Sequence, residues 1–287
     1  MYLRSFDPWK SDLCTCPSKY SLNPYTGCSH RCIYCYASSY IKNFFNCRTK
    51  PNLLEDLKRQ LKKIPKDSLI SLSNTSDPYP PIEKELKITR KCLKIFKDFE
   101  MKVLIITKSD IVLRDIDLLK EMKSTVTLTI TSLKFYQELE PNAPSPFIRL
   151  KAIEKLSKKG INTGLRIDPI ILGINEVEID KILILAKESG VRHIIASTFK
   201  PRWDSWKRFS RVFPEISKKL EELYFKEGSK ISNSWYLPES IRKELILKVS
   251  QKCSEIGLSF SSCREGFPEL NNSLSCDGSH LIEDRKV

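Results

Sequence analysis

From residue 51 to about residue 200, apolar stretches of strand length alternate with amphipathic stretches of helical length. This alternation is typical of repeated βα units around a parallel sheet. The strand candidates are rich in Ile, Val, Leu and Thr, and one more strand is expected before Cys28; the others are 69–72, 103–107, 125–131, 163–167 and 193–197. Six strands with crossover helices predict an α/β fold, a (βα)6 partial TIM barrel, with its active site at the carboxyl ends of the strands.

Helices are expected between these strands, because apolar residues recur three and four positions apart there. The predicted ranges are 52–63, 83–96, 111–122, 146–158 and 176–188. In the last range, one apolar face is expected to lie against the sheet: Val177, Ile179, Ile182, Leu183, Leu185 and Ala186. Gly160 and Gly190 follow two of the predicted helices, where a residue that tolerates positive φ suits a C-terminal cap.

The pattern changes after about Lys200, where an aromatic and basic stretch is followed by two predicted helices, 215–226 and 238–256, and a tail that contains cysteines. We therefore expect an N-terminal segment (1–20), a partial barrel (21–200) and a helical extension that packs on the barrel (201–287). No apolar run approaches the ~20 residues needed to cross a bilayer. The N-terminus lacks the pattern of a secretory signal, so a cytoplasmic location without a membrane partner is expected.

Cys28, Cys32 and Cys35 have the spacing C-x3-C-x2-C within the segment NPYTGCSHRCIYCYA. In a reducing compartment, ten cysteines are more typical of metal ligands, catalytic thiols or buried hydrophobes than of disulfides. Three thiolates in a tight loop can bind three corners of a [4Fe-4S] cluster and leave the fourth iron open to a non-protein ligand. The alternative is a zinc knuckle with His30 as fourth ligand, although His30 lies awkwardly between the first two cysteines.

A second segment, SNTSDPYPPIE at 73–83, follows the second predicted strand. Together with the cysteine loop, it resembles the radical SAM superfamily, and within it the spore photoproduct lyase-like group often labelled DNA repair photolyase. The resemblance runs from about Ser21 to Ser197. It implies an enzyme that uses a [4Fe-4S] cluster to cleave S-adenosylmethionine (SAM) and generate a 5′-deoxyadenosyl radical, with an electron donor such as ferredoxin or flavodoxin.

The resemblance also implies residues that contact SAM. Ser76 and Lys108 match family positions of this kind, with the lysine reaching the methionyl carboxylate. Lys108 directly follows the strand VLIIT, which independently places a cation at a strand end. Thr129, Arg166 and Asp168 are further candidates, for which polar caps on barrel strands are the alternative. Tyr34 is expected to pack on the cluster or the adenine, or else to be a core tyrosine.

Asn74 marks a departure from the group. In spore photoproduct lyase, a cysteine that returns a hydrogen atom to the substrate radical stands at the position of Asn74. An amide cannot donate a hydrogen atom as a thiol does. The resemblance therefore carries over the SAM chemistry without the substrate.

The remaining cysteines suggest a second metal site. Cys14 and Cys16 form a CTC string, and Cys276 begins the string CDGSH, which resembles the motif of CDGSH iron-sulfur proteins. We predict a second iron-sulfur cluster or a zinc ion on Cys14, Cys16 and Cys276, with Cys263 or His280 as fourth ligand. Free thiols are the alternative. Cys47 and Cys92 are expected to be buried structural cysteines.

The charge balance favours a polyanionic partner, because the formal net charge is +14. Basic and aromatic residues gather at 200–211, and we predict that Arg202 and Arg208 neutralise phosphates while Trp203 or Trp206 stacks on a base of a nucleic acid. The alternative is that the tryptophans pack against the barrel. The competing function is a non-catalytic iron-sulfur or zinc protein that binds nucleic acid or transfers electrons. Such a protein has no need for Ser76 and Lys108 at successive strand ends.

Overall fold

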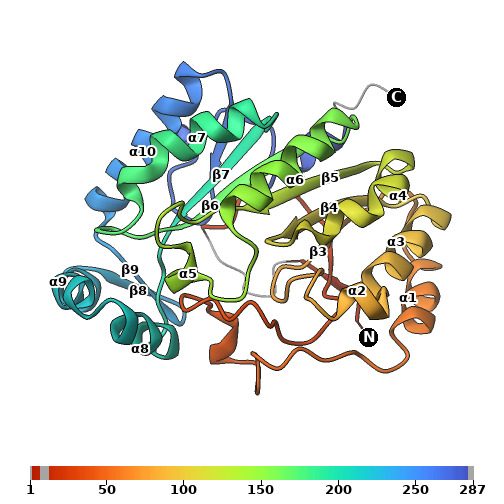
Figure 1. Ribbon diagram of the computed structural model, residues 1–287, viewed down its shortest axis with the longest axis horizontal. Coiled ribbons are helices and arrows are strands. Elements are labelled where there is room, and N and C mark those ends of the chain that lie inside the picture. The colour runs from red at the N-terminus through yellow and green to blue at the C-terminus, as the bar shows by residue number, and fades with distance from the viewer. Residues whose placement is uncertain (1, 7–12, 284–287) are drawn as a thin grey trace.

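One eight-stranded sheet organises the protein, with helices along its outer face (Figure 1). The computed structural model describes residues 2–6 and 13–283. Strand β1 (Arg4–Ser5) pairs antiparallel with β2 (Tyr20–Leu22) at one edge. The strands after β2 run parallel to it, in chain order: β3 (Leu69–Leu72), β4 (Lys102–Thr107), β5 (Ser124–Thr129), β6 (Thr163–Ile170), β7 (His193–Thr198) and β10 (Ser259–Ser262).

The six predicted strands are confirmed as β2 to β7, so the parallel α/β fold expected from the sequence is present. The difference lies in the extension, which adds a seventh parallel strand. β10 pairs with β7 from Ser259 opposite His193 to Ser262 opposite Ala196. Its sequence, SFSS, lacks the run of β-branched residues that marks the other strands, so local sequence gave no signal for it.

Helices α1 (Leu53–Leu61), α2 (Glu83–Leu86), α3 (Ile88–Asp98), α4 (Ile116–Glu121), α6 (Pro146–Lys158) and α7 (Ile179–Glu188) lie between the strands in sequence. The predicted 83–96 helix is broken at Lys87, which has a left-handed φ of 52°. The buried Glu83 carboxylate explains the break, because it accepts hydrogen bonds from the backbone N–H groups of Thr89 and Arg90 and so caps α3. The predicted 111–122 helix likewise starts as a 3-10 turn, Asp110–Asp115.

Helix α6 has the bounds that the sequence predicts. The predicted 176–188 helix begins with a 3-10 turn, Glu176–Glu178, before α7. Val177, expected against the sheet, lies in this turn and is 77% exposed, because the turn does not continue the face of α7. None of the helices in residues 2–6 and 13–283 has the length and apolar character needed to span a membrane.

The extension begins with α8 (Trp203–Val212) and α9 (Pro214–Phe225), which agrees with the predicted 215–226 helix. A small hairpin, β8 (Ser229–Ile231) and β9 (Ser234–Tyr236), leads to α10 (Glu239–Glu255). The short helix α5 (Tyr136–Leu139) was not expected from the sequence.

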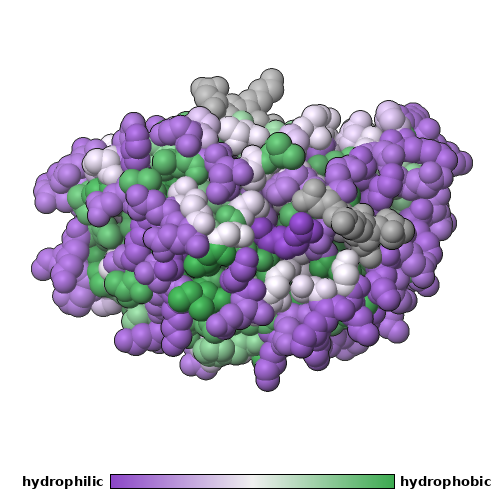
Figure 2. All heavy atoms as spheres, turned by 90° about the horizontal axis from the view of Figure 1, so that it is seen from above, coloured by the Kyte–Doolittle hydropathy of each residue, from purple (hydrophilic) through white to green (hydrophobic). Residues whose placement is uncertain are grey.

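Hydrophilic side chains cover most of the face in Figure 2, and hydrophobic ones lie among them in small groups.

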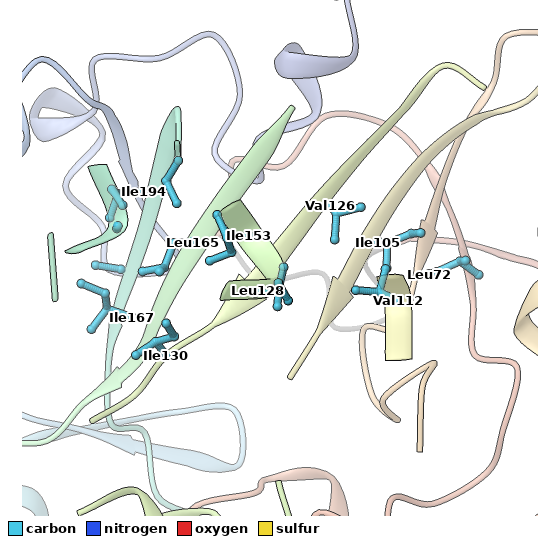
Figure 3. Close-up of a cluster of buried hydrophobic side chains, with 14 of the residues drawn as sticks. Leu72, Ile105, Val112, Val126, Leu128, Ile130, Ile153, Leu165, Ile167 and Ile194 are labelled. Atoms are coloured by element: carbon cyan, nitrogen blue, oxygen red, sulfur yellow. The ribbon is translucent and has the colours of Figure 1, made fainter. Parts of the chain in front are cut away.

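Buried aliphatic side chains from neighbouring strands form the core between sheet and helices (Figure 3). Ile105, Val126 and Leu165 come from three successive strands, and Ile153 comes from α6; each is fully buried. Burying one such side chain contributes roughly 1.5–3 kcal/mol. This packing sets where each strand ends, and therefore where the polar residues that follow the strands are held.

The C-terminal tail closes the amino-terminal end of the barrel. The side-chain amide of Asn162, which precedes β6, donates to the carbonyl of Leu281 across 2.6 Å, and Lys102 at the start of β4 pairs with Glu283. Gly278 has φ +81°, and a Cβ there would lie 3.1 Å from the ring of His193, the first residue of β7. Both observations favour glycine at this position, so the tail is fitted closely to the end of the barrel.

Candidate active site

A cavity of about 650 Å³ lies at the carboxyl ends of the strands, where barrels of this type place their active sites. Its wall includes the three cysteines of the C-x3-C-x2-C loop and every residue predicted to contact SAM or the cluster. The lining residues from that prediction are Cys28, Cys32, Tyr34, Cys35, Ser76, Lys108, Thr129 and Arg166. The structure thus brings together side chains from the cysteine loop and from four different strand ends.

The cysteine loop is folded tightly after β2. Gly27 has φ +81°, and a Cβ there would lie 2.4 Å from the carbonyl oxygen of Phe44, so the loop requires glycine. The N–H of Cys28 donates to the same carbonyl across 2.8 Å, and that of Cys35 donates to Cys32 across 3.2 Å. Burial raises the pKa of Cys32 to about 12 although nearby Lys108 opposes this, so without a metal the thiol stays protonated at neutral pH.

The spacing of these thiols suits a cluster. Within the described part of the chain, no three His, Cys, Asp or Glu side chains converge closely enough to hold a single metal ion. Yet Cys28, Cys32 and Cys35 all face one cavity, and thiolates are the ligands of iron-sulfur clusters. A cluster is larger than one ion and holds its ligands farther apart, so the donor set fits a [4Fe-4S] cluster.

His30 contacts Asp77 through a ring nitrogen, which lies 3.5 Å from the carboxylate. Burial lowers the pKa of this imidazole, although Asp77 raises it. Asp77 also accepts hydrogen bonds from the Thr107 hydroxyl (2.7 Å) and from the backbone N–H of Lys108 (2.8 Å). His30 is therefore part of a contact between the cysteine loop and β4, which disfavours the zinc-knuckle alternative.

Asn23 joins the two sequence motifs in the same way. Its side-chain oxygen accepts hydrogen bonds from the backbone N–H groups of Thr75 and Ser76, both 3.1 Å long. Asn23 and Asp77 lie inside the two sequence motifs, but the sequence alone predicted no role for them. Their position inside the motifs was the only available signal, because these contacts join residues that are about 30 to 50 positions apart.

Glu140 is a buried residue beside the cavity that contacts several site residues. The sequence did not predict a role for it. It accepts hydrogen bonds from the hydroxyls of Tyr34 and Thr131, pairs with Arg149 at 2.5 Å, and lies 4.0 Å from Lys108 Nζ. Burial would raise the pKa of Glu140, but Arg149 and Lys108 outweigh it and lower the pKa. The ammonium of Lys108 lies 5.6 Å from the Tyr34 ring centroid, so both are held at the cavity wall.

Arg166 and Asp168 form an ion pair on β6, with 2.6 Å between Nη2 and Oδ2, and both line the cavity. Burial would raise the pKa of Asp168, but the guanidinium lowers it below its usual value. On the neighbouring strand, Thr129 lines the cavity, and its carbonyl accepts a hydrogen bond from Arg149. Asn74 lies on the wall as well, where its amide donates to the hydroxyl of Ser21 across 2.7 Å.

The basic aromatic segment of α8 is only partly buried, so its role in nucleic-acid binding stays a prediction. Trp206 is only 6% exposed and packs on Tyr224 and Phe225, as the alternative predicted. Trp203 stacks on Phe225 with 5.0 Å between ring centroids but remains 59% exposed. Arg208 donates to the carbonyls of Ile33 and Cys35, at 3.0 and 2.8 Å. This segment therefore supports the cysteine loop through Arg208, while Lys207 and Arg211 of the same helix are exposed.

The structure also brings most of the second predicted metal site together. The thiols of Cys16 and Cys276 lie 3.2 Å apart, and Cys14, Cys16 and Cys263 line the cavity. His280 lies elsewhere, with Nδ1 2.7 Å from the hydroxyl of Ser275. As expected, Cys92 is buried, whereas Cys47 is only partly so.

Residues 22–186, more than half of the chain, match the sequence profile described as "Radical SAM superfamily". The chain belongs to the radical SAM superfamily. The fold agrees, since a spore photoproduct lyase variant with bound AdoMet and dinucleoside spore photoproduct superimposes with a TM-score of 0.67 at 19% identity, over 90% of this chain and 79% of the other.

Relatives of this chain include the uncharacterized protein MJ0683 of Methanocaldococcus jannaschii, 39% identical over 167 residues. That match covers 56% of this chain and 64% of the relative, just under two thirds of its length. A protein of Pseudomonas phage M6, named radical SAM Nalpha-GlyT isomerase, is 22% identical over 84% of this chain and 53% of its own length. These names leave the reaction class of this enzyme open.

Proposed function

We propose that this radical SAM enzyme binds a [4Fe-4S] cluster through Cys28, Cys32 and Cys35, binds SAM beside it, and acts on nucleic acid. The observation that supports this is the common cavity, into which the cysteine loop and the predicted SAM contacts both face. When bound, the cluster and SAM supply the electron and the 5′-deoxyadenosyl radical that abstracts hydrogen from a substrate. The chain's own residues bind, orient and enclose the reactants.

Lys108, Ser76, Thr129 and Arg166 are the proposed SAM contacts. Burial would lower the pKa of Lys108, but the negative charges of Cys32 as a cluster-bound thiolate and of Glu140 raise it, so Lys108 remains charged. An ammonium with few water contacts binds a carboxylate strongly. Asp168 neutralises part of the charge of Arg166, which holds that guanidinium in place at the wall.

The charge of the cavity supports an anionic substrate. Its lining includes nine Lys and Arg residues against three Asp residues and no Glu. Several of these cations are paired, such as Lys200 with Glu265. In the part of the chain that the structure describes, Arg31, Lys50 and Arg264 form no ion pair with a carboxylate. Phosphates of a nucleic acid would neutralise such cations, and the rings of Tyr36 and Tyr40 in the wall suit stacking on a base.

The test is anaerobic reconstitution with iron and sulfide, followed by addition of SAM and dithionite. We expect 5′-deoxyadenosine and methionine to form, and the triple change of Cys28, Cys32 and Cys35 to Ala to abolish both. Cys47→Ser is the matched control and should retain activity, since Cys47 lies outside the cavity lining. Full SAM cleavage by the triple variant would contradict the assignment of the loop. Iron binding without any SAM cleavage in the unmodified protein would favour the non-catalytic alternative.

A further inference from the structure

Four cysteines from three distant parts of the chain meet between the cavity and the C-terminal tail. Cys16 Sγ lies 3.2 Å from Cys276 Sγ, across 260 positions of sequence. The thiol of Cys16 also interacts with that of Cys14, and Cys263 is near enough to act on it electrostatically. Cys263 follows β10 directly, and its N–H donates to the carbonyl of Ala196 in β7. Its position is therefore set by the strand that the extension adds to the sheet.

Cationic groups surround these thiols. Lys19 is buried, forms an ion pair with Asp277, and lies within electrostatic range of both Cys16 and Cys276. Arg166 contacts the thiol of Cys263 as well as Asp168. Lys19 and Arg166 can balance part of the negative charge that thiolates carry when they bind a metal. The site thus has the ligands and the charge that a thiolate-bound metal centre requires.

The structure distinguishes between the two candidates for a fourth ligand. His280 Nδ1 interacts with the Ser275 hydroxyl, and its ring packs edge-on against His193 with 4.8 Å between centroids. Cys263, by contrast, lies in the same cavity wall as Cys14 and Cys16. The fourth ligand consistent with these contacts is therefore Cys263.

We propose that Cys14, Cys16, Cys263 and Cys276 bind a second iron-sulfur cluster. Two thiolates on one tetrahedral metal, each about 2.3 Å from it, lie roughly 3.8 Å apart, close to the separation of Cys16 and Cys276. Four thiolates suit either zinc or an iron-sulfur cluster. Cys16 and Cys276 could share one iron, while no three ligand side chains in the described residues converge on one ion position. A cluster, whose ligands are divided among several irons, is therefore a better fit than a single zinc ion. The inference uses none of the three loop cysteines, so it does not depend on the proposed function.

The experiment uses the full chain in which Cys28, Cys32 and Cys35 are all changed to Ala, reconstituted anaerobically with iron and sulfide. We expect this variant to retain iron, acid-labile sulfide and a visible charge-transfer absorption. Adding Cys263→Ser or Cys276→Ser should remove them. His280→Gln and Cys253→Ser, added in the same way, are the matched controls and should leave the iron and sulfide content unchanged.

Circular dichroism must show that each variant is folded. As a second measurement, Mössbauer spectra of the unmodified chain should contain two clusters, one of which is lost in Cys276→Ser while SAM cleavage persists. A folded triple variant without iron and sulfide would overturn the proposal. Zinc bound instead of iron and sulfide would overturn the proposal of an iron-sulfur cluster. A disulfide between Cys16 and Cys276, detected by mass spectrometry in the reconstituted protein, would also overturn it. Loss of SAM cleavage in the triple variant tests the proposed function separately.

Discussion

The carboxylate of Asp77 accepts a hydrogen bond from the backbone N–H of Lys108 across 2.8 Å. This contact fixes the position of Lys108 relative to the 73–83 segment, and Asp77 also contacts His30 of the cysteine loop. The side chain of Asp77 therefore connects the 73–83 segment, Lys108 and the cysteine loop.

Asp77→Ala is expected to destabilise the fold and to impair SAM cleavage. It leaves the partly buried N–H of Lys108 without this partner, at a cost of roughly 1 kcal/mol. Urea unfolding and 5′-deoxyadenosine formation are the measurements. Glu100→Ala, at an exposed ion pair with Lys66, is the control and should change neither. Equal behaviour of the two variants would contradict the role given to Asp77.

Arg208→Ala should weaken retention of the loop cluster. Arg208 donates to carbonyls of Ile33 and Cys35, so its loss frees the backbone next to two proposed ligands. We expect faster loss of iron in air than in Lys207→Ala, which changes an exposed residue of the same helix. Iron release followed by a chelator distinguishes them. Identical rates would show that the loop does not depend on α8.

Nucleic-acid binding should depend on cations of the cavity more than on α8. Each phosphate contact with a single strand contributes a slope of about −0.7 to log K against log salt. The double change Arg31→Ala with Arg264→Ala should flatten the slope measured with a single-stranded oligonucleotide, whereas Arg211→Ala, exposed on α8, should leave it unchanged. Oligonucleotide affinity that does not depend on salt in the unmodified protein or in either variant would rule out nucleic acid as the proposed substrate.

Binding of the same oligonucleotide should also fall between pH 7 and pH 9. Burial, together with Arg4, lowers the pKa of Lys50 from 10.5 to about 8. Lys50 is charged below this value and neutral above it, so a phosphate contact weakens as pH rises through about 8. A bound phosphate raises the pKa of Lys50, so the binding is lost at a higher pH than in the free protein. Lys50→Arg should keep binding constant over this range, because the guanidinium does not deprotonate.

Free energies of unfolding can test how closely the tail fits the barrel. Gly278 and Gly160 both have positive φ, 81° and 76°, but only Gly278 faces a close contact, with His193. Replacement of either by Ala strains the backbone by roughly 1–2 kcal/mol. We expect Gly278→Ala to be the more destabilising in urea, since it adds a steric clash. Equal losses in the free energy of unfolding would mean that the tail can shift away from His193 and that its fit contributes nothing measurable to stability.

The local sequence was sufficient for the sheet and the cysteine loop. Strands β3 to β7 were predictable, since Ile, Val, Leu and Thr are concentrated in short runs between amphipathic segments. The loop was predictable because its three cysteines lie within eight residues, so their spacing alone limits what they can bind. For the same reason, Lys108 was placed at a strand end by its neighbours in the chain.

Tertiary structure decided everything that depends on residues far apart in sequence. β10 forms because SFSS lies beside β7, and Arg208 meets the cysteine loop across more than 170 positions. The sequence left the surroundings of the α8 tryptophans open, because amphipathicity shows that a face is apolar without showing what covers it. The structure buries Trp206 and leaves Trp203 59% exposed. Likewise, Cys263 and not His280 lies with Cys14 and Cys16, a choice made by the path of the tail through the barrel and by the position of β10.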